Sequence, residues 1–308
     1  MPTSRDNTTI SVCLITYNHA KFISQALQSI WVQSCSARIE VVLGDDASND
    51  GTSEVAQSEA HRWGDRLTIL RRASNLGVGG NVLETLAACT GDYIALLEGD
   101  DYWTSSQKLE RQLEVLEHRP DASGCFHPVQ VVDDAGRRVR SKPIPRRYRE
   151  LDAQRLLRIG TVIPTCSVLL RNLGAPPEWL RPLTVVDTPL FVWAGTHGPL
   201  VCLRSELAAY RLHPGGVFSG ADSKRRLGYV TNMYAAIAEN YPQWRAIARA
   251  RADYWLAVHA AKSGDLRTAR RHAISRALAQ PTTLESLKAI FIALAPRLYA
   301  RLQSRLSR

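Results

Sequence analysis

The chain has 308 residues, of which 45% are hydrophobic and 22% are charged, and its formal net charge is +10. This composition is ordinary for a folded globular protein, so it excludes a disordered chain, a collagen-like chain and a small disulfide-stapled scaffold. The basic excess lies in residues 221–308, which contain 16 basic and 5 acidic side chains, whereas residues 1–220 are nearly neutral. A basic C-terminal region suits nucleic acid, an acidic partner or an anionic membrane surface.

The first hundred residues alternate apolar strands with amphipathic helices. The strand signals are compact apolar runs, and the helix signals are apolar residues at a spacing of three or four. We expect strands over 10–16, 39–44, 67–70 and 93–97, helices over 20–31 and 80–89, and a further helix after the turn at 45–52. This alternation predicts right-handed crossovers and a mainly parallel sheet flanked by helices.

The remaining residues carry fewer and shorter signals. Helices are expected over 106–118 and 189–196, a strand over 166–170, and a loop over the basic, proline-interrupted stretch 136–150. From about Ser223 onward the sequence is rich in Ala, Leu and Arg, and residues 252–279 predict two helices joined at 263–265.

Cysteine spacing and apolar runs bear on the location of the chain. Six cysteines are scattered without a CxxC pair, so the sequence contains neither a zinc ribbon nor a redox motif. The start, MPTSRDNTTI, lacks an apolar signal core, and no apolar run reaches the roughly 18 residues of a membrane span. We therefore expect a cytoplasmic protein, either free or peripheral at the inner face of the cell membrane.

Polar clusters follow three of the predicted strands. They are Thr16–Tyr17–Asn18, Asp45–Asp46 and Glu98–Gly99–Asp100–Asp101. Because ligands of an open parallel sheet bind beyond the carboxyl ends of its strands, the three clusters should meet in one crevice. An aromatic ring with several carboxylates suits a nucleotide whose diphosphate holds Mg²⁺ or Mn²⁺, since carboxylate oxygens select these cations. Either acidic cluster alone could instead cap the helix that follows it.

The motifs, taken in order, resemble one family. The strings SVCLITYNHAKFISQALQSIWVQ, VVLGDDASNDGT, GDYIALLEGDDYW, TCSVLLRN, VVDTPLF and YRLHPGGVFSG make the chain similar to family 2 glycosyltransferases. The resemblance covers roughly residues 9–220 and is to the bacterial branch with an EGDDYW form of the DxD motif. It implies an α/β fold of the GT-A type, which is Rossmann-like, followed here by an α-helical C-terminal extension.

The resemblance also implies which residues bind the nucleotide-sugar donor. Tyr17 would border the base, Asp46 would hydrogen-bond the base, and Asp100 would face the ribose. The full implied set is Thr16, Tyr17, Asn18, Asp46, Asn75, Gly77 and Asp100.

A metal site and a catalytic base follow from the same resemblance. Asp101 would hold a Mg²⁺ or Mn²⁺ ion together with Asp100, and His213 would close over the metal or the diphosphate. Asp187 falls where the family keeps the base that takes the acceptor's proton, and it could also cap the helix that follows. The chain departs from the family pattern at the first DxD position, which is Glu98, and at the base position, which has one carboxylate.

We therefore predict a metal-dependent, inverting glycosyltransferase that moves one sugar from a UDP-, dTDP- or GDP-sugar to a glycan or lipid-linked acceptor. The expected pathway is bacterial surface polysaccharide or lipopolysaccharide assembly, and single transfer is favoured because no QxxRW element is visible. Transfer to a polyprenyl phosphate and a non-catalytic GT-A-like binding module are the alternatives. A sugar-nucleotide pyrophosphorylase would need a Gly-rich basic loop where this chain has TYNHAKF.

Two domains are predicted. A catalytic domain over 1–222 would have a donor-binding half at about 9–103 and an acceptor half at about 104–222, and a basic helical region would cover 223–308. In that region one helical stripe is basic and a neighbouring one is apolar: Arg297, Arg301, Arg305 and Arg308 beside Leu298, Leu302 and Leu306. Such a helix could bind an anionic membrane surface or pack on the body, and no nucleic-acid partner is expected.

Overall fold

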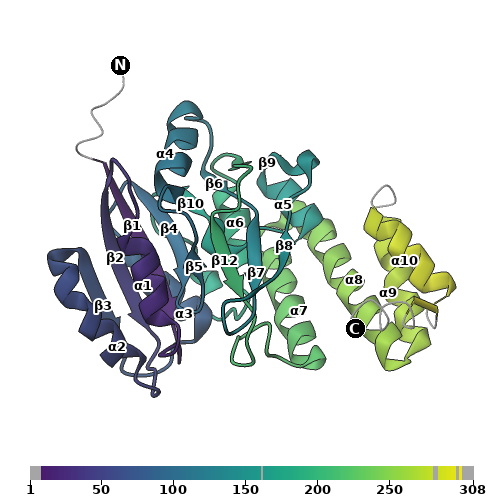
Figure 1. Ribbon diagram of the computed structural model, residues 1–308. Helices are drawn as coiled ribbons and strands as arrows, with labels where there is room; N and C mark the ends of the chain where they lie inside the picture. Colours follow the sequence, from purple (N-terminus) through teal and green to yellow (C-terminus); the bar gives the residue numbers. More distant parts are fainter. Residues whose placement is uncertain (1–7, 161, 280–283, 296–297, 300–308) are drawn as a thin grey trace. The chain divides into compact units, whose positions relative to one another are not determined.

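The computed structural model describes residues 8–160, 162–279, 284–295 and 298–299. Figure 1 traces the chain from the N-terminal strands to the C-terminal helices. Two compact units are distinguished. The first comprises the chain up to Leu156 together with Thr161–Gly220, and the second comprises Leu157–Gly160 and the chain from Ala221 onward. The functional division into donor half, acceptor half and C-terminal region stays a prediction.

Among the described residues, eight strands form the main sheet of the first unit. In spatial order they are β3 (Leu67–Arg71), β2 (Arg38–Asp45), β1 (Thr9–Thr16), β4 (Tyr93–Glu98), β10 (Leu169–Arg171), β6 (Gly124–Phe126), β11 (Leu200–Cys202) and β9 (Glu150–Leu151). The first four are parallel, β10 is antiparallel to both neighbours, β11 is parallel to β6, and β9 is antiparallel to β11. The mainly parallel α/β sheet is therefore confirmed.

Helices flank this sheet, as the alternation of signals predicts. They are α1 (Ile23–Trp31), α2 (Thr52–Glu59), α3 (Gly77–Ala87), α4 (Lys108–His118), α5 (Ala153–Ile159) and α6 (Asp187–Ala194). Helix α1 begins three residues later than the apolar spacing suggests. The carbonyl of His19 accepts the N–H groups of both Phe22 and Ile23, so residues 19–22 form a turn that precedes the helix.

A smaller sheet of the first unit corrects one expectation. Its order is β5 (Tyr102–Trp103), β12 (Ala208–Arg211), β7 (Val129–Val132) and β8 (Arg138–Lys142). The predicted loop over 136–150 is wrong, because this stretch contains β8, a 3₁₀ turn at Arg146–Tyr148 and β9. Strand β8 pairs with β7 alone and is mostly exposed, so its sequence lacks the apolar alternation that would have revealed it.

The second unit is helical. Helices α7 (Ser223–Asn240), α8 (Arg245–Ser263), α9 (Leu266–Ala279) and α10 (Leu284–Leu294) follow one another along the chain. Asp222 caps α7 by accepting the N–H of Arg225 at 2.9 Å, and Gly264 ends α8 with a φ of +86°. The helical hairpin expected over 252–279 is present, although α8 begins earlier than its apolar pattern indicates.

The basic stripe expected at the C-terminal end lies outside the described residues, because Arg297, Arg301, Arg305 and Arg308 are not among them. Leu302 and Leu306 lie outside as well. Within the described part of the chain, no helix combines the length and the apolar character that crossing a membrane requires.

One buried charge stands out beneath the two sheets. Lys108 is fully buried, and its Nζ donates to Oε1 of Gln112 at 2.7 Å and lies 4.3 Å from the centre of the Trp103 ring. Burial lowers the pKa of Lys108 to about 7, although the aromatic ring favours the charged form. The lysine therefore binds its proton much more weakly in the folded chain than in the unfolded chain.

This shift makes stability depend on pH. Between about pH 7 and pH 10 the unfolded chain binds a proton at Lys108 that the folded chain does not, so stability rises with pH. We therefore compare the wild type with Lys108→Met. The unfolding free energy of the wild type minus that of the variant should increase by up to about 1.4 kcal/mol per pH unit. Urea unfolding of both proteins across this range measures the difference. Lys262→Met, at an exposed position of α8, is the control, and its difference from the wild type should not change with pH. A pH-independent difference between the wild type and Lys108→Met would contradict the lowered pKa of Lys108.

Candidate active site

Strand register brings the three polar clusters to one edge of the main sheet. Thr16 at the end of β1 pairs with Asp45 at the end of β2, and Ile15 pairs with Glu98 at the end of β4. The carboxyl ends of these parallel strands therefore coincide, and segments that are far apart in the sequence become neighbours. The three clusters meet where the sequence analysis expects them.

Hydrogen bonds join the loops that follow β1 and β2. Asn18 has a φ of 56°, its N–H donates to the hydroxyl of Ser48 at 2.8 Å, and its Oδ1 accepts the N–H of Asn49 at 3.0 Å. The buried carboxylate of Asp45 accepts the Ser48 hydroxyl from the other side. Asn18 thus holds the two loops together, while the neighbouring Tyr17 is 41% exposed and presents its ring outward.

Asp46 lies against the loop that precedes α3. Its Oδ1 accepts the N–H of Leu76 at 2.6 Å, and the side chain of Asn75 donates to its backbone carbonyl at 3.1 Å. Gly77 adopts a φ of +76° and donates its N–H to Oδ1 of Asn75. Burial raises the pKa of Asp46, although the N–H groups of Leu76 and Gly77 act to lower it. Three of the predicted donor residues are therefore in mutual contact.

A second group forms where β12 ends beside the loop after β4. Nε2 of His213 lies 2.9 Å from Oδ2 of Asp100, and Nε2 of His19 lies 3.9 Å from the same oxygen. Burial acts to raise the pKa of Asp100, but His213 and His19 hold that pKa below its ordinary value. Burial lowers the pKa of the His19 imidazole, against the opposing charge of Asp100. All three side chains are nearly buried.

Asp101 lies beside Asp100 in the loop after β4 and contacts strand β12. Its side chain is 2% exposed, and its Oδ1 accepts the backbone N–H of Arg211 at 2.8 Å. Burial and the charge of Asp100 raise the pKa of Asp101 well above its ordinary value. Its Oδ1 thus anchors strand β12, whereas its Oδ2 is buried and has no hydrogen-bond partner in the described part of the chain. The expectation that Asp101 holds a metal stays a prediction.

The Arg211 guanidinium connects four segments around this loop. It donates to the carbonyl of Asp100 at 2.8 Å, to the carbonyls of Asp133 and Asp134, and to Oε1 of Gln25 at 2.6 Å. It also lies 4.6 Å from the centre of the Phe22 ring. Because the arginine is only 3% exposed, these acceptors replace its water.

Asp187 is the first residue of α6. Its Oδ1 accepts the N–H of Thr188 at 2.6 Å. The N-cap position of α6 is Val186, so Asp187 lies in the first turn of the helix and does not occupy the cap position that we considered for it. Burial raises the pKa of Asp187, while the Thr188 N–H and the positive charge of Lys142 act to lower it. Burial also raises the pKa of Glu98 well above its ordinary value, and the charges of neighbouring carboxylates, Asp187 among them, add to the effect. Asp187 and Glu98 thus belong to one acidic region.

Three residues of this site were missed by the sequence analysis. His19 follows the Tyr17–Asn18 pair directly, and a histidine at the end of a strand was a usable signal. Arg211 stands two residues before His213 in the YRLHPGG string, but its role depends on contacts that spacing does not reveal. Lys142 lies in the stretch that was taken for a loop.

The donor set of this group suits a divalent cation. One nitrogen from each of His19 and His213 and one oxygen from Asp100 lie within 4.8 Å of one another. Nδ1 of His19 is buried without a hydrogen-bond partner, so that imidazole is not held in place by its other nitrogen. Imidazole nitrogen with carboxylate oxygen is a common ligand set for first-row transition ions.

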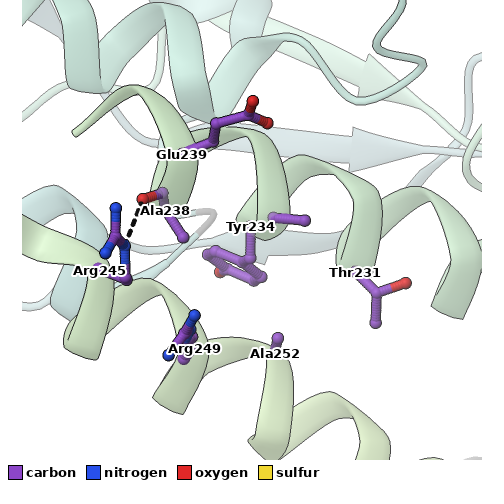
Figure 2. A pocket seen from close by; sticks show the side chains of 8 residues that line it. Thr231, Tyr234, Ala238, Glu239, Arg245, Arg249 and Ala252 are labelled. Atoms are coloured by element: carbon purple, nitrogen blue, oxygen red, sulfur yellow. Dashed lines mark hydrogen bonds between the residues drawn. The ribbon is translucent and has the colours of Figure 1, made fainter. Parts of the chain in front are cut away.

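A pocket of 390 Å³ lies apart from these residues, within the helical unit. Figure 2 shows its wall, to which α7 contributes Tyr234 and Glu239 and α8 contributes Arg245 and Arg249. Arg245 donates to the carbonyl of Ala238 and so helps to close the helix end. None of the predicted site residues lines this pocket.

Comparisons with known proteins agree with the motifs. The model of Glycosyl transferase family 2 matches residues 11–173. An uncharacterized protein of Mycobacterium tuberculosis is 32% identical over 229 residues, which are 74% of this chain and 66% of that protein. The chain therefore spans slightly less than two thirds of the length of this curated relative.

Two solved structures share the fold. S. aureus TarS (residues 1–349, in complex with UDP-GlcNAc) has a TM-score of 0.60 at 14% identity, covering 97% of this chain and 92% of that chain. The mannosyltransferase PcManGT of Pyrobaculum calidifontis, in complex with GDP-Man and Mn²⁺, has a TM-score of 0.58 at 18% identity, covering 96% and 84%. At these identities the likeness concerns the fold alone, and it confirms the expected GT-A architecture.

The contacts of Arg211 predict a large loss of stability on its replacement. Arg211→Met keeps most of the side-chain volume but removes the guanidinium donors from the carbonyls of Asp100, Asp133 and Asp134 and from Oε1 of Gln25. We expect the unfolding free energy to fall by roughly 3 kcal/mol, since a hydrogen bond to a charged group contributes about 1.5–3 kcal/mol and several are lost together. Urea unfolding measures the change, with Arg137→Met, whose side chain is 82% exposed, as the matched control. Equal effects of the two substitutions would show that the Arg211 contacts contribute little.

Proposed function

The chain belongs to glycosyl transferase family 2 and is a glycosyltransferase. We propose that it is a metal-dependent, inverting enzyme. It would transfer one sugar from a nucleoside-diphosphate sugar to an acceptor hydroxyl. The observation that carries the proposal is the contact of Asp100 with His213 beside the end of β4, with Asp187 in the same acidic region. A carboxylate beside an imidazole suits a cation that neutralises a diphosphate, and a separate carboxylate suits a base. The reaction needs both.

The donor would bind across the ends of β1 and β2. The carboxylate of Asp46 would accept a hydrogen bond from the nucleobase, since its remaining acceptor sites are not all used by Leu76. The exposed ring of Tyr17 would border the base, with Thr16, Asn18, Asn75 and Gly77 shaping the site around it. Two proteins of the same fold support a nucleotide-sugar donor, because their structures contain UDP-GlcNAc or GDP-Man.

Asp100 and His213 would hold the divalent cation, Mg²⁺ or Mn²⁺, next to the donor diphosphate. A bound cation supplies charge neutralisation for the departing diphosphate. The structure with GDP-Man also contains Mn²⁺, which supports a metal-dependent reaction in this chain. The hydrogen bond of Asp101 Oδ1 with the N–H of Arg211 would keep β12 and His213 in register with Asp100, and the role of Asp101 as a further ligand stays a prediction.

Asp187 would act as the general base. Its carboxylate would take the proton of the acceptor hydroxyl as that oxygen attacks the anomeric carbon from the side opposite the leaving diphosphate, which inverts the configuration. The hydrogen bond from the Thr188 N–H fixes one oxygen and leaves the other for this role. Burial raises the pKa of Asp187, which makes the carboxylate a stronger base than an exposed aspartate.

For the acceptor we propose a glycan or lipid-linked hydroxyl in bacterial surface polysaccharide assembly, bound by residues of the half at about 104–222. Transfer to a polyprenyl phosphate would need no base, since a phosphate oxygen is already ionised. The presence of Asp187 beside the acidic cluster therefore favours a hydroxyl acceptor. The presence of Asp187 at this place also disfavours a non-catalytic binding module, because binding alone does not require a base.

A lipid-linked acceptor would place the enzyme at the inner face of the membrane, and the helical unit supports such a location. Helix α10 exposes Leu287, Ile290 and Leu294, which recur at a spacing of three and four, and α9 exposes Ile274 and Leu278. The region around them carries the basic excess of the chain. Apolar side chains within a basic surface are suited to the interface of an anionic bilayer.

The base role of Asp187 is separable from its hydrogen bond at the start of α6. Asp187→Asn should lower turnover by roughly 10²–10⁴, the usual contribution of general-base catalysis, with donor affinity nearly unchanged. Steady-state transfer rates and calorimetric donor binding measure the two quantities. Asp152→Asn is the control, because Asp152 also accepts a backbone N–H at the start of a helix, that of Arg155 at 2.7 Å, and has no proposed part in catalysis. A loss of donor binding with unchanged turnover in Asp187→Asn would assign this residue to the donor site.

The membrane contact depends on exposed leucines. A double variant, Leu287→Glu with Leu294→Glu, should fold normally because both side chains are exposed, and it should lose most binding to vesicles that contain phosphatidylglycerol. Vesicle flotation at low salt measures the bound fraction. Val139→Glu, at a position of β8 that is 57% exposed, is the control and should bind like the wild type. If the wild type itself stays in solution, the proposed location is wrong.

A further inference from the structure

We infer that His19 is a third protein ligand of the cation, so that two imidazoles and one carboxylate bind the metal and select a transition ion over Mg²⁺. This inference rests on the proposed function, because it concerns the same metal site. Neither the motif pattern nor the expected roles of Asp100 and His213 include this residue. It follows from the position of His19 beside both of them.

The backbone places the His19 side chain without help from a ligand. The N–H of His19 donates to the hydroxyl of Thr52 at 2.8 Å, and its carbonyl accepts the N–H groups of Phe22 and Ile23. Both contacts are made by the main chain, so they are independent of the imidazole. The residue is thus held where β1 ends, facing the loop after β4.

The distances suit ligands that share one ion. Ligand atoms about 2.1 Å from a common cation lie roughly 3 to 4 Å apart. Nε2 of His213 and Nε2 of His19 lie 2.9 and 3.9 Å from Oδ2 of Asp100. The longer separation is beyond a hydrogen bond, so a direct bond between His19 and Asp100 does not explain why this imidazole lies here.

The two ring nitrogens of His19 differ in their surroundings. Nε2 is the nitrogen that faces Asp100, so it is the one that would bind the cation. Nδ1 is buried without a hydrogen-bond partner, so no protein acceptor or donor fixes the tautomer of this imidazole. Gly99 borders this nitrogen, and a Cβ at that position would lie 3.0 Å from it and 2.6 Å from the Thr16 hydroxyl. A glycine in the DxD loop thus leaves the room that His19 occupies.

An aromatic contact orients both imidazoles. The ring of Phe22 packs edge-to-face on His213 with centroids 4.9 Å apart, and on His19 with centroids 6.5 Å apart. The two imidazoles are themselves 5.9 Å apart in a similar arrangement. Rings fixed by packing lose little freedom when they bind an ion, which favours a preformed site.

The ligand set predicts the choice of metal. Imidazole is a better ligand for Mn²⁺, Co²⁺ and Zn²⁺ than for Mg²⁺, which prefers oxygen ligands and its own water. A site with two imidazoles should therefore bind Mn²⁺ in the absence of any nucleotide and prefer it to Mg²⁺. A site with one imidazole and one carboxylate should bind the cation weakly until the donor supplies phosphate oxygens as further ligands.

Pulsed electron paramagnetic resonance of the full chain loaded with Mn²⁺ alone tests the inference directly. The wild type should give nitrogen couplings from two imidazoles, and His19→Ala should give those of one. Titration should also show Mn²⁺ binding weakened by at least about tenfold in His19→Ala, with a smaller preference over Mg²⁺. His118→Ala, at an exposed position of α4, is the matched control and should bind Mn²⁺ like the wild type.

The outcomes separate this inference from the proposed function. Couplings from a single imidazole in the wild type, or unchanged Mn²⁺ affinity in a folded His19→Ala, would overturn the role of His19 and leave the metal site of Asp100 and His213 intact. If Asp100→Asn and His213→Ala also bind Mn²⁺ like the wild type, the metal site itself is wrong. The wild-type spectrum decides the number of imidazoles even if a variant fails to fold.

Discussion

The candidate site depends on the docking of strand β12 against the loop after β4. Asp101 accepts the N–H of Arg211, and the Arg211 guanidinium returns a hydrogen bond to the carbonyl of Asp100. These two contacts fix the register between segments that lie more than a hundred residues apart in the sequence. His213, two residues further on, is thereby brought to the carboxylate of Asp100. Without this docking, the carboxylates at the end of β4 would lack His213.

The same arrangement concentrates negative charge in a place where water is largely excluded. Burial and mutual repulsion raise the pKa values of Glu98 and Asp101 well above the ordinary range, and burial raises that of Asp187. Clustered buried carboxylates are unfavourable for folding unless cations or hydrogen-bond donors compensate them. Arg211 and the two histidines supply part of that compensation. A divalent cation with the donor diphosphate would supply more, which ties the stability of the site to the ligands that it is proposed to bind.

The sequence predicted the scaffold better than the details of the site. The parallel strands were predictable because strands buried on both faces need continuous apolar runs, as β1 has. Strand β8 was not, because an exposed edge strand needs no apolar pattern. Asp46, Asn75 and Gly77 were correctly grouped by motif, whereas the contact of Asp101 with β12 was not predicted. The pairing of β12 decides that Asp100, and not Asp101, faces the histidines. This pairing is a long-range contact, so no local pattern in the sequence predicts it.

Ligand-dependent thermal unfolding of the full chain tests the proposed nucleotide-sugar site most directly. A ligand that binds the native state raises the unfolding temperature, so UDP, dTDP and GDP can be compared with and without Mn²⁺. We expect at least one nucleotide to raise the unfolding temperature more in the presence of Mn²⁺ than the nucleotide and Mn²⁺ do separately when their effects are added. The reason is that Asp46 would hold the base while Asp100 and His213 hold the ion beside the diphosphate. Unfolding temperatures that none of the three nucleotides changes, with or without Mn²⁺, would contradict a nucleotide-sugar site at the ends of these strands.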